Sequence, residues 1–208
     1  MRANLFLMTN LIFLASCATN IPEVVDNSID SSNTELESTV LKNDSFAGVQ
    51  FFMDGMLFFE QGDYARAIIE FQDSIEAGSN SPEVYFNMSE AYWMLQKYDK
   101  SISLAKKAIL LDDSAVDYKI SLGKKYIALN NYELSLDVFN GIALKNPKNA
   151  DVLFIIGDLK AELNDVDGAL LYYQEAYNVD NELILALEVA AQLAYNSNHM
   201  DLPKILKK

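Results

Sequence analysis

The sequence is poor in the residues that metal and catalytic sites use most. Its 208 residues include one cysteine and one histidine. A structural zinc site needs three or four closely spaced His, Cys or carboxylate ligands, and one cysteine cannot form an intrachain disulfide. No nucleotide-binding, zinc-protease or serine-hydrolase motif occurs, and His199 lies in a turn-like stretch where it should be solvated. We therefore expect a protein that is not an enzyme and that needs no metal and no cofactor.

Positive charge is also scarce. The chain has 16 Lys and Arg against 30 Asp and Glu, for a formal net charge of -14. This excess of acids argues against nucleic-acid binding and against anchoring by a basic patch on an anionic membrane. Half of the residues are hydrophobic and 22% are charged, so most of the chain should fold around a core. The composition favours a module that binds other proteins, with no small-molecule substrate.

The first 16 residues have the build of a secretory signal. Arg2 is followed by a short apolar run, Leu5 to Leu14, and then by small residues. A ten-residue run makes a helix of ~15 Å, about half of the ~30 Å hydrocarbon core, so it cannot be a permanent membrane span. The end of the run, Leu14-Ala15-Ser16-Cys17, resembles the lipobox of bacterial lipoproteins. That resemblance implies cleavage before Cys17 and lipid on Cys17. The alternative is ordinary cleavage nearby, with Cys17 present by accident.

The residues that follow Cys17 suggest a destination and a tether. In Gram-negative lipoproteins an Asp after the lipidated Cys retains the protein at the inner membrane. Ala18 here implies the outer membrane, with the protein facing the periplasm. Residues 17–45 are rich in Ser, Asn, Thr and acids, and low hydrophobicity with one-sided charge predicts a disordered tether. A short helix around residues 34–42 would be marginal alone.

From Phe46 onward, residue types recur every 34 positions. Tyr64, Tyr98 and Tyr132 form one such series. Two further series hold small residues: Gly55, Ser89, Gly123, Gly157 and Ala191 in one, and Ala67, Ser101, Ser135 and Ala169 in the other. An aromatic series runs through Phe71, Phe139 and Tyr173, with Ala105 in the gap. This period and pattern resemble the tetratricopeptide repeat, a helix–turn–helix unit.

The resemblance implies an all-α fold over residues 46–208, a right-handed superhelical solenoid of stacked helix pairs. We place repeats at residues 48–81, 82–115, 116–149 and 150–183, and a partial capping repeat at 184–208 that begins with a helix from Ile184 to Asn196. One helix pair cannot bury its own apolar face, so stacking is required. Asp54, Lys119 and Lys160 depart from the family pattern, and Lys160 predicts looser packing of the fifth repeat's helix.

In stacked repeats of this family the first helices line a concave groove. The resemblance assigns partner contacts to Phe52, Met56, Phe59, Phe86, Glu90, Trp93, Ile120, Lys124, Ile127, Phe154 and Asp158. An apolar strip with an acidic edge suits an amphipathic helix or an extended apolar segment with basic neighbours, and tryptophans such as Trp93 are common interface hot spots. The alternative is that these aromatic residues pack against each other. The Lys and Asn pattern of chaperone-binding carboxylate clamps is absent.

These expectations combine into a lipid-anchored adaptor of the cell envelope that positions a protein partner. Its build is similar to that of type IV pilus pilotins, which help a secretin assemble. Adaptors that gather peptidoglycan hydrolases and an accessory factor of the barrel-assembly machine have a similar build, so these alternatives stay open. A third possibility is a structural module that associates with itself through its aromatic groove.

Replacing Cys17 by serine should abolish lipidation, because serine lacks the sulfur that carries the diacylglycerol. We expect Cys17→Ser to remain uncleaved at this site, to incorporate no labelled palmitate and to leave the outer-membrane fraction. Labelling and fractionation of the variant equal to wild type would contradict the lipoprotein interpretation.

Overall fold

The computed structural model describes residues 31–197, with side chains from Phe46 onward. The chain divides into two units, residues 1–38 and residues 39–208, and the second contains helices α2 to α9. Cys17 and the signal segment lie outside the described residues, as do His199 and the end of the predicted capping repeat. Within the described part, none of the helices combines the length and apolar character needed to cross a membrane.

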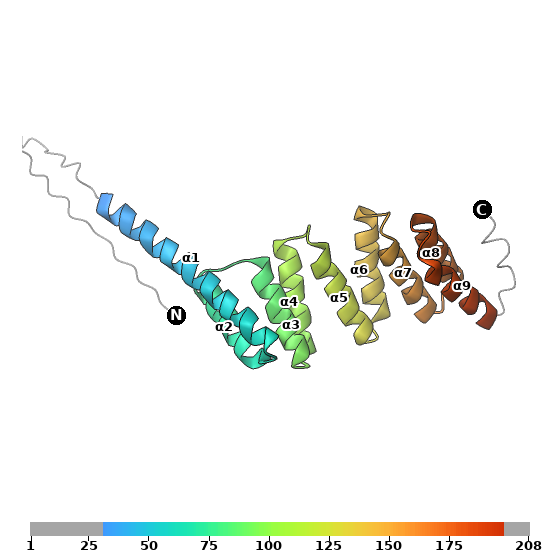
Figure 1. Cartoon of the computed structure of the whole chain (residues 1–208), viewed down its shortest axis with the longest axis horizontal. Coiled ribbons are helices and arrows are strands. Elements are labelled where there is room, and N and C mark those ends of the chain that lie inside the picture. The colour runs from blue at the N-terminus through green and yellow to red at the C-terminus, as the bar shows by residue number, and fades with distance from the viewer. Residues whose placement is uncertain (1–30, 198–208) are drawn as a thin grey trace, which may run out of the picture. The chain divides into compact units, whose positions relative to one another are not determined.

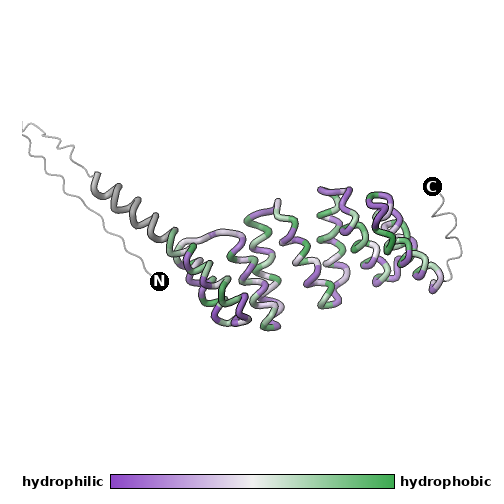
Figure 2. Tube along the Cα trace, viewed as in Figure 1, coloured by the Kyte–Doolittle hydropathy of each residue, from purple (hydrophilic) through white to green (hydrophobic). Residues whose placement is uncertain are grey.

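The described residues form nine helices and no strands. Their bounds are α1 Ser31–Glu60, α2 Tyr64–Glu76, α3 Pro82–Met94, α4 Tyr98–Leu111, α5 Val116–Ala128, α6 Tyr132–Lys145, α7 Ala150–Glu162, α8 Val166–Val179 and α9 Ile184–Asn196. From α2 to α9 each helix packs against its neighbours in the chain (Figure 1). Apolar and polar residues alternate along α2 to α9, as expected when one side of each helix packs (Figure 2). The predicted all-α solenoid is confirmed, and α9 has the expected bounds.

Helix α1 begins at Ser31, well before the expected domain start at Phe46. The structure thus corrects the expected disordered tether for residues 31–45, which are helical, while residues 17–30 lie outside the described part. The physical reason is that residues 31–45 continue directly into the packed part of helix α1. A short helix alone would carry the full nucleation cost, but the second half of α1 packs against α2 and propagates the helix backwards. Residues 31–47 contain no proline or glycine to stop it.

The turn between the two helices of each repeat has one recurring geometry. One residue per turn, 34 positions apart, has a positive φ: Gly62, Gln96, Asn130 and Asn164. Just after it, a backbone N–H donates to the carbonyl five residues earlier, as in Asp63 to Phe58 at 2.9 Å. This is a Schellman-type ending, which satisfies carbonyls that the helix end would leave free. The side chain of Asp63 then caps α2 by accepting from the Arg66 backbone N–H.

The helices of a repeat approach closely where a small residue faces an aromatic ring. A methyl group added to Gly123 would lie 2.5 Å from the buried ring of Phe139. Gly55 faces Phe71 and Gly157 faces Tyr173 in the same way, at 2.6 Å and 2.7 Å. Since real Cβ atoms do not approach carbon this closely, a side chain at any of these three positions would force the facing ring to shift.

In the second repeat, different residues occupy the same contact between the two helices. Its small-residue position holds Ser89 and the facing position holds Ala105, so both members of the pair change together. The space is shared with Ser101, whose hydroxyl lies 3.2 Å from that of Ser89 in a buried hydrogen bond. The exchange keeps the helices close while both hydroxyl groups remain paired.

Two departures from the family pattern have structural explanations. Asp54 stands where later repeats bury Met88, Leu122 and Ile156. Those residues pack toward the preceding repeat, which the described chain lacks before α1, and Asp54 instead accepts a hydrogen bond from Gln50 at 3.2 Å. A polar residue is therefore appropriate at this end of the stack.

Lys119 is the second such departure. Its ammonium donates to the Asp113 carboxylate at 2.5 Å, and Lys145 pairs with the same carboxylate. Hydrogen bonds from these two lysines lower the pKa of Asp113 to about 2. The three residues tie the loop after α4 to α5 and to the end of α6.

The expectation of loose packing at Lys160 is wrong. Lys160 donates to Asp165 at 2.7 Å and lies over the Tyr172 ring, with 5.7 Å from its ammonium to the ring centroid. Helix α9 packs closely because its inner face is made of small buried residues: Ala186, Ala190 and Ala194. Ala191, a member of the small-residue series at the 34-residue period, is exposed.

Two glycine substitutions test the close approach. Gly123→Ala should lower the free energy of unfolding by up to about 2 kcal/mol, because overpacking costs ~1–3 kcal/mol and the ~1 kcal/mol gain in helix propensity offsets only part of it. Gly141→Ala, in the middle of α6 with nothing within 4 Å of the new methyl group, should raise it by about 0.5–1 kcal/mol. Urea denaturation measures both. A gain in both variants would contradict the packing described here.

Candidate functional site

The predicted groove residues lie on the first helices of the repeats. They come from α1, α3, α5 and α7, and every one except Lys124 is partly buried. Their aromatic rings pack against neighbouring rings outside the set: Phe52 on Phe71, Phe59 on Tyr64, Phe86 on Tyr118, Trp93 on Tyr98 and Phe154 on Tyr173. These contacts give the groove residues a packing role, as the alternative expects, although their ring partners lie outside the set. Each keeps part of its surface in solvent.

A buried ion pair connects α3 to α5 among these residues. Lys125 is only 4% exposed, and its ammonium donates to Glu90 at 2.5 Å and to the Ser121 hydroxyl at 2.7 Å. Ser121 in turn donates to the same Glu90 oxygen at 2.7 Å. The Lys125 ammonium also lies 5.6 Å from the centroid of the Trp93 ring, within the range of a cation–π contact. The arrangement fixes the orientation of Glu90 and of Trp93 together.

Sequence reasoning named the neighbouring lysine and missed this one. Lys124 was the predicted groove residue, but it is exposed and makes none of the ion pairs seen in the described chain. Lys125 occupies a register that is buried and apolar in the adjacent repeats, as Ala91 and Leu159. A charged residue at a buried register needs a partner. That conflict was readable in the sequence and could have identified Lys125.

A second feature is a pocket of about 330 Å³ between the first helices α5 and α7. We call it the α5–α7 pocket, and its lining residues are Ile127, Tyr132, Ile155, Asp158, Leu159, Ala161, Glu162 and Tyr173. Two predicted groove residues, Ile127 and Asp158, thus meet at one concavity. The walls are mainly apolar, and the carboxylates of Asp158 and Glu162 come from successive turns of α7.

The environment of Asp158 disfavours its charge. Burial raises the pKa of Asp158, a hydrogen bond from the Tyr173 hydroxyl at 2.8 Å lowers it in part, and the nearby charge of Glu162 raises it further. Burial and the same hydrogen bond raise the pKa of Tyr173, so its hydroxyl stays protonated as a donor. None of the ion pairs in the described part of the chain involves Asp158 or Glu162.

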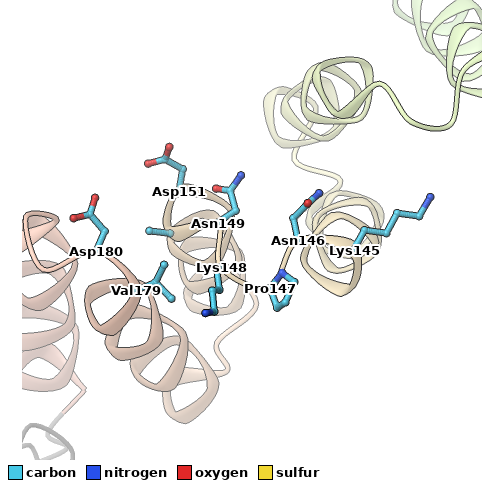
Figure 3. Close-up of a pocket in the computed structure, with 9 residues that line it drawn as sticks. Lys145, Asn146, Pro147, Lys148, Asn149, Asp151, Val179 and Asp180 are labelled. Atoms are coloured by element: carbon cyan, nitrogen blue, oxygen red, sulfur yellow. The ribbon is translucent and has the colours of Figure 1, made fainter.

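A larger concavity lies elsewhere in the described part of the chain. It has a volume of about 700 Å³ and is formed by the α6–α7 loop and the end of α8 (Figure 3). Its charged side chains do not converge: Lys145 and Lys148 point away from each other, and Asp151 and Asp180 point outward (Figure 3). Lys145 is already paired with Asp113. This open hollow therefore lacks the convergent polar groups of a binding site.

Among the side chains that the structure describes, residues 46–197, no group of three or more His, Cys, Asp or Glu could hold a metal ion. Two pairs of polar side chains do converge: Glu90 forms an ion pair with Lys125, and Asp158 accepts a hydrogen bond from Tyr173. What the arrangement offers is a partly exposed apolar surface with two anchored carboxylates, which is suited to binding.

Comparison with known proteins identifies the repeat. A model of the tetratricopeptide repeat family matches residues 52–116 and 120–182. The chain is 28% identical over 109 residues to human tetratricopeptide repeat protein 12, covering 52% of this chain and 15% of that protein. It is 23% identical over 124 residues to the TPR repeat-containing protein MJ1428 of Methanocaldococcus jannaschii, covering 60% and 22% respectively. The chain thus spans less than a quarter of the length of either relative.

Solved structures share the fold. A crystal structure of MamA superposes with a TM-score of 0.65 at 18% identity, over 77% of this chain and 88% of that one. A fragment of MamA from Desulfovibrio magneticus gives a TM-score of 0.63 at 15% identity, over 77% and 94%. YrrB, a repeat protein described as having an unusual peptide-binding site, gives 0.59 at 19% identity, over 76% and 85%. At these identities the likeness shows the fold alone.

Removing the Lys125 ammonium should leave Glu90 without its cation. We expect Lys125→Met to cost about 1–3 kcal/mol of unfolding free energy, less than a fully buried pair costs because the Glu90 side chain is 28% exposed. The double variant Lys125→Met/Glu90→Met should recover most of that loss. Lys124→Met, a change of the exposed neighbour, should stay within about 0.5 kcal/mol of wild type. An equal fall in the urea midpoint for Lys124→Met and Lys125→Met would contradict a stabilising role of the buried Lys125–Glu90 pair.

Proposed function

The chain belongs to the tetratricopeptide repeat family, whose stacked helix pairs are protein-interaction modules, and from that premise we propose that it is an adaptor that holds a segment of a partner protein along its first helices. The observation that carries this proposal is the row of partly exposed aromatic and aliphatic side chains on those helices. Phe86, Trp93 and Ile127 are each held in place by packing yet keep exposed surface. Pre-ordered anchors lose little conformational entropy on binding.

We further propose that the adaptor works in the cell envelope, anchored by lipid on Cys17. The Leu14-Ala15-Ser16-Cys17 segment supports the anchor, and Ala18 supports the outer membrane as the destination, with the repeat domain facing the periplasm. Helix α1 begins at Ser31, so residues 18–30 are the stretch between this helix and the lipidated cysteine. Assistance to a pilus or secretin complex is the preferred role, and peptidoglycan hydrolases or the barrel-assembly machine supply the alternative partners.

Self-association is a second candidate, favoured by one observation. Four large apolar residues on α1 are more than half exposed and recur at helical spacing: Phe46, Val49, Met53 and Leu57. A stripe of this kind on one helix face suits another helix. Sedimentation at several protein concentrations distinguishes a self-associating module from a monomeric adaptor, and so does the response to Met53→Lys, which should dissociate only an assembly built on this stripe.

The groove can be tested in cells by a photo-crosslinking residue. Placed at position 127, on the groove side of α5, it should capture the partner. Placed at position 144, on the exposed surface of α6, it should not. The captured protein, identified by mass spectrometry and purified, becomes the ligand for affinity measurements. Equal capture from both positions would contradict a groove that holds the partner.

The triple variant Phe86→Ala/Trp93→Ala/Ile127→Ala should bind this partner at least about thirtyfold more weakly, since one interface hot spot is worth ~2 kcal/mol. Its helical circular dichroism should persist. The matched control removes three exposed apolar side chains from second helices, Leu110→Ala/Leu134→Ala/Leu144→Ala, and should bind normally. A folded triple variant with wild-type affinity would overturn the proposed function. Thermal midpoints on the same samples separate lost binding from unfolding.

A further inference from the structure

The α5–α7 pocket has a size and a lining suited to one long side chain. Its volume of about 330 Å³ lies at the bottom of the ~300–1,000 Å³ range of small-molecule sites. Ile127 and Ala161 provide apolar wall, and Asp158 and Glu162 place two carboxylates on the α7 wall. Lysine and arginine have this division, an apolar stem that ends in a charge.

The two acidic residues at equivalent registers, Glu90 and Asp158, have different partners. Glu90 is neutralised within the chain by Lys125 at 2.5 Å. The α9 residues at the registers of Ser121 and Lys125 are Val189 and Leu193, which supply neither a donor nor a cation.

Asp158 therefore has no internal counterpart of Lys125. The Tyr173 hydroxyl occupies one of its oxygens. Lys124 forms no ion pair with it, and Lys160, on the same helix, is engaged by Asp165. Within the described residues the pocket thus presents negative charge that no basic side chain balances, in a place where burial makes that charge costly.

We infer that the α5–α7 pocket receives a lysine or arginine side chain from the partner segment, with its stem against Ile127 and Ala161 and its charge at Asp158 and Glu162. The inference rests on the proposed function, because the partner segment must lie along the first helices to reach the pocket. Such a cation complements the charge of the pocket, because it removes the repulsion between the two carboxylates and replaces the water that Asp158 lost on burial.

The other acids along the first helices do not add to this argument. Glu83, Asp117 and Asp151 are exposed and lie in the first turns of α3, α5 and α7. There they stabilise the helix dipole, which explains them without a ligand. Asp158 and Glu162 lie in the later turns of α7, where the dipole offers a carboxylate no such benefit.

The test begins with selection of random phage-displayed peptides on the full chain. Each selected peptide is synthesised in two forms, one with its lysine and arginine residues intact and one with norleucine in their place. Norleucine keeps an aliphatic stem and removes the charge. Binding to wild type is measured by fluorescence anisotropy, and the charged form should bind about tenfold or more tightly, as expected for a charge-assisted hydrogen bond.

The double variant Asp158→Asn/Glu162→Gln should bind the two peptide forms equally. Asparagine at 158 keeps an oxygen to accept from Tyr173, so the variant should fold normally by circular dichroism. The matched control, Asp137→Asn/Glu175→Gln, removes the same charge from exposed positions on α6 and α8 and should retain the preference for the charged peptide. A preference lost in both double variants would show a general charge effect and overturn the inference.

The remaining outcomes separate this inference from the proposed function. Selected peptides that lose affinity in the Phe86, Trp93 and Ile127 triple variant but show no preference for charge would overturn the basic-side-chain pocket and leave the groove intact. Peptides whose affinity is unchanged by the triple variant would overturn the groove as well. A selection that yields no peptide containing lysine or arginine also overturns the inference.

Discussion

The close contact between the two helices of each repeat is the constraint on which the rest of the structure depends. Gly55, Gly123 and Gly157 let an aromatic ring from the second helix pack against backbone, where even a methyl group would collide. Because the two helices of a repeat pack so closely, their remaining apolar faces pack against the neighbouring repeat, and the repeats stack. Stacking aligns the first helices and brings their exposed side chains into one row.

Departures from the repeat pattern are mostly compensated locally, and the compensation shapes the candidate site. Between the second and third repeats the apolar cluster is small, with three buried members: Ala105, Leu122 and Tyr126. There the buried Lys125 joins Glu90 across the two first helices, and Phe86 stacks on Tyr118 at 4.6 Å between ring centroids. The Lys125–Glu90 ion pair thus connects the two repeats where the buried apolar cluster between them is small, and Lys125 also contacts the Trp93 ring. Glu90 and Trp93 therefore belong both to the contact between repeats and to the predicted groove.

The two acidic positions of the groove illustrate how one register can serve two purposes. Glu90 forms an ion pair with Lys125 inside the protein, so it contributes to the contact between the second and third repeats. Asp158 accepts a hydrogen bond from Tyr173 and lines the α5–α7 pocket, where burial disfavours its charge. The difference arises from the next repeat, which supplies a lysine to one and a leucine to the other. In repeat proteins the neighbour's sequence therefore decides whether a side chain is structural or available to a partner.

The 34-residue period by itself determined the helix pairs, their order and the bounds of α9, because spacing of small and aromatic residues reports helix contacts directly. The groove residues also followed from register. Tertiary structure alone decided what their side chains touch. It buried Lys125 and exposed Lys124, although the two are adjacent, since a rotation of one residue on a helix moves a side chain from solvent into the joint. It also extended α1 back to Ser31, because packing of the second half meets the nucleation cost that the isolated segment could not.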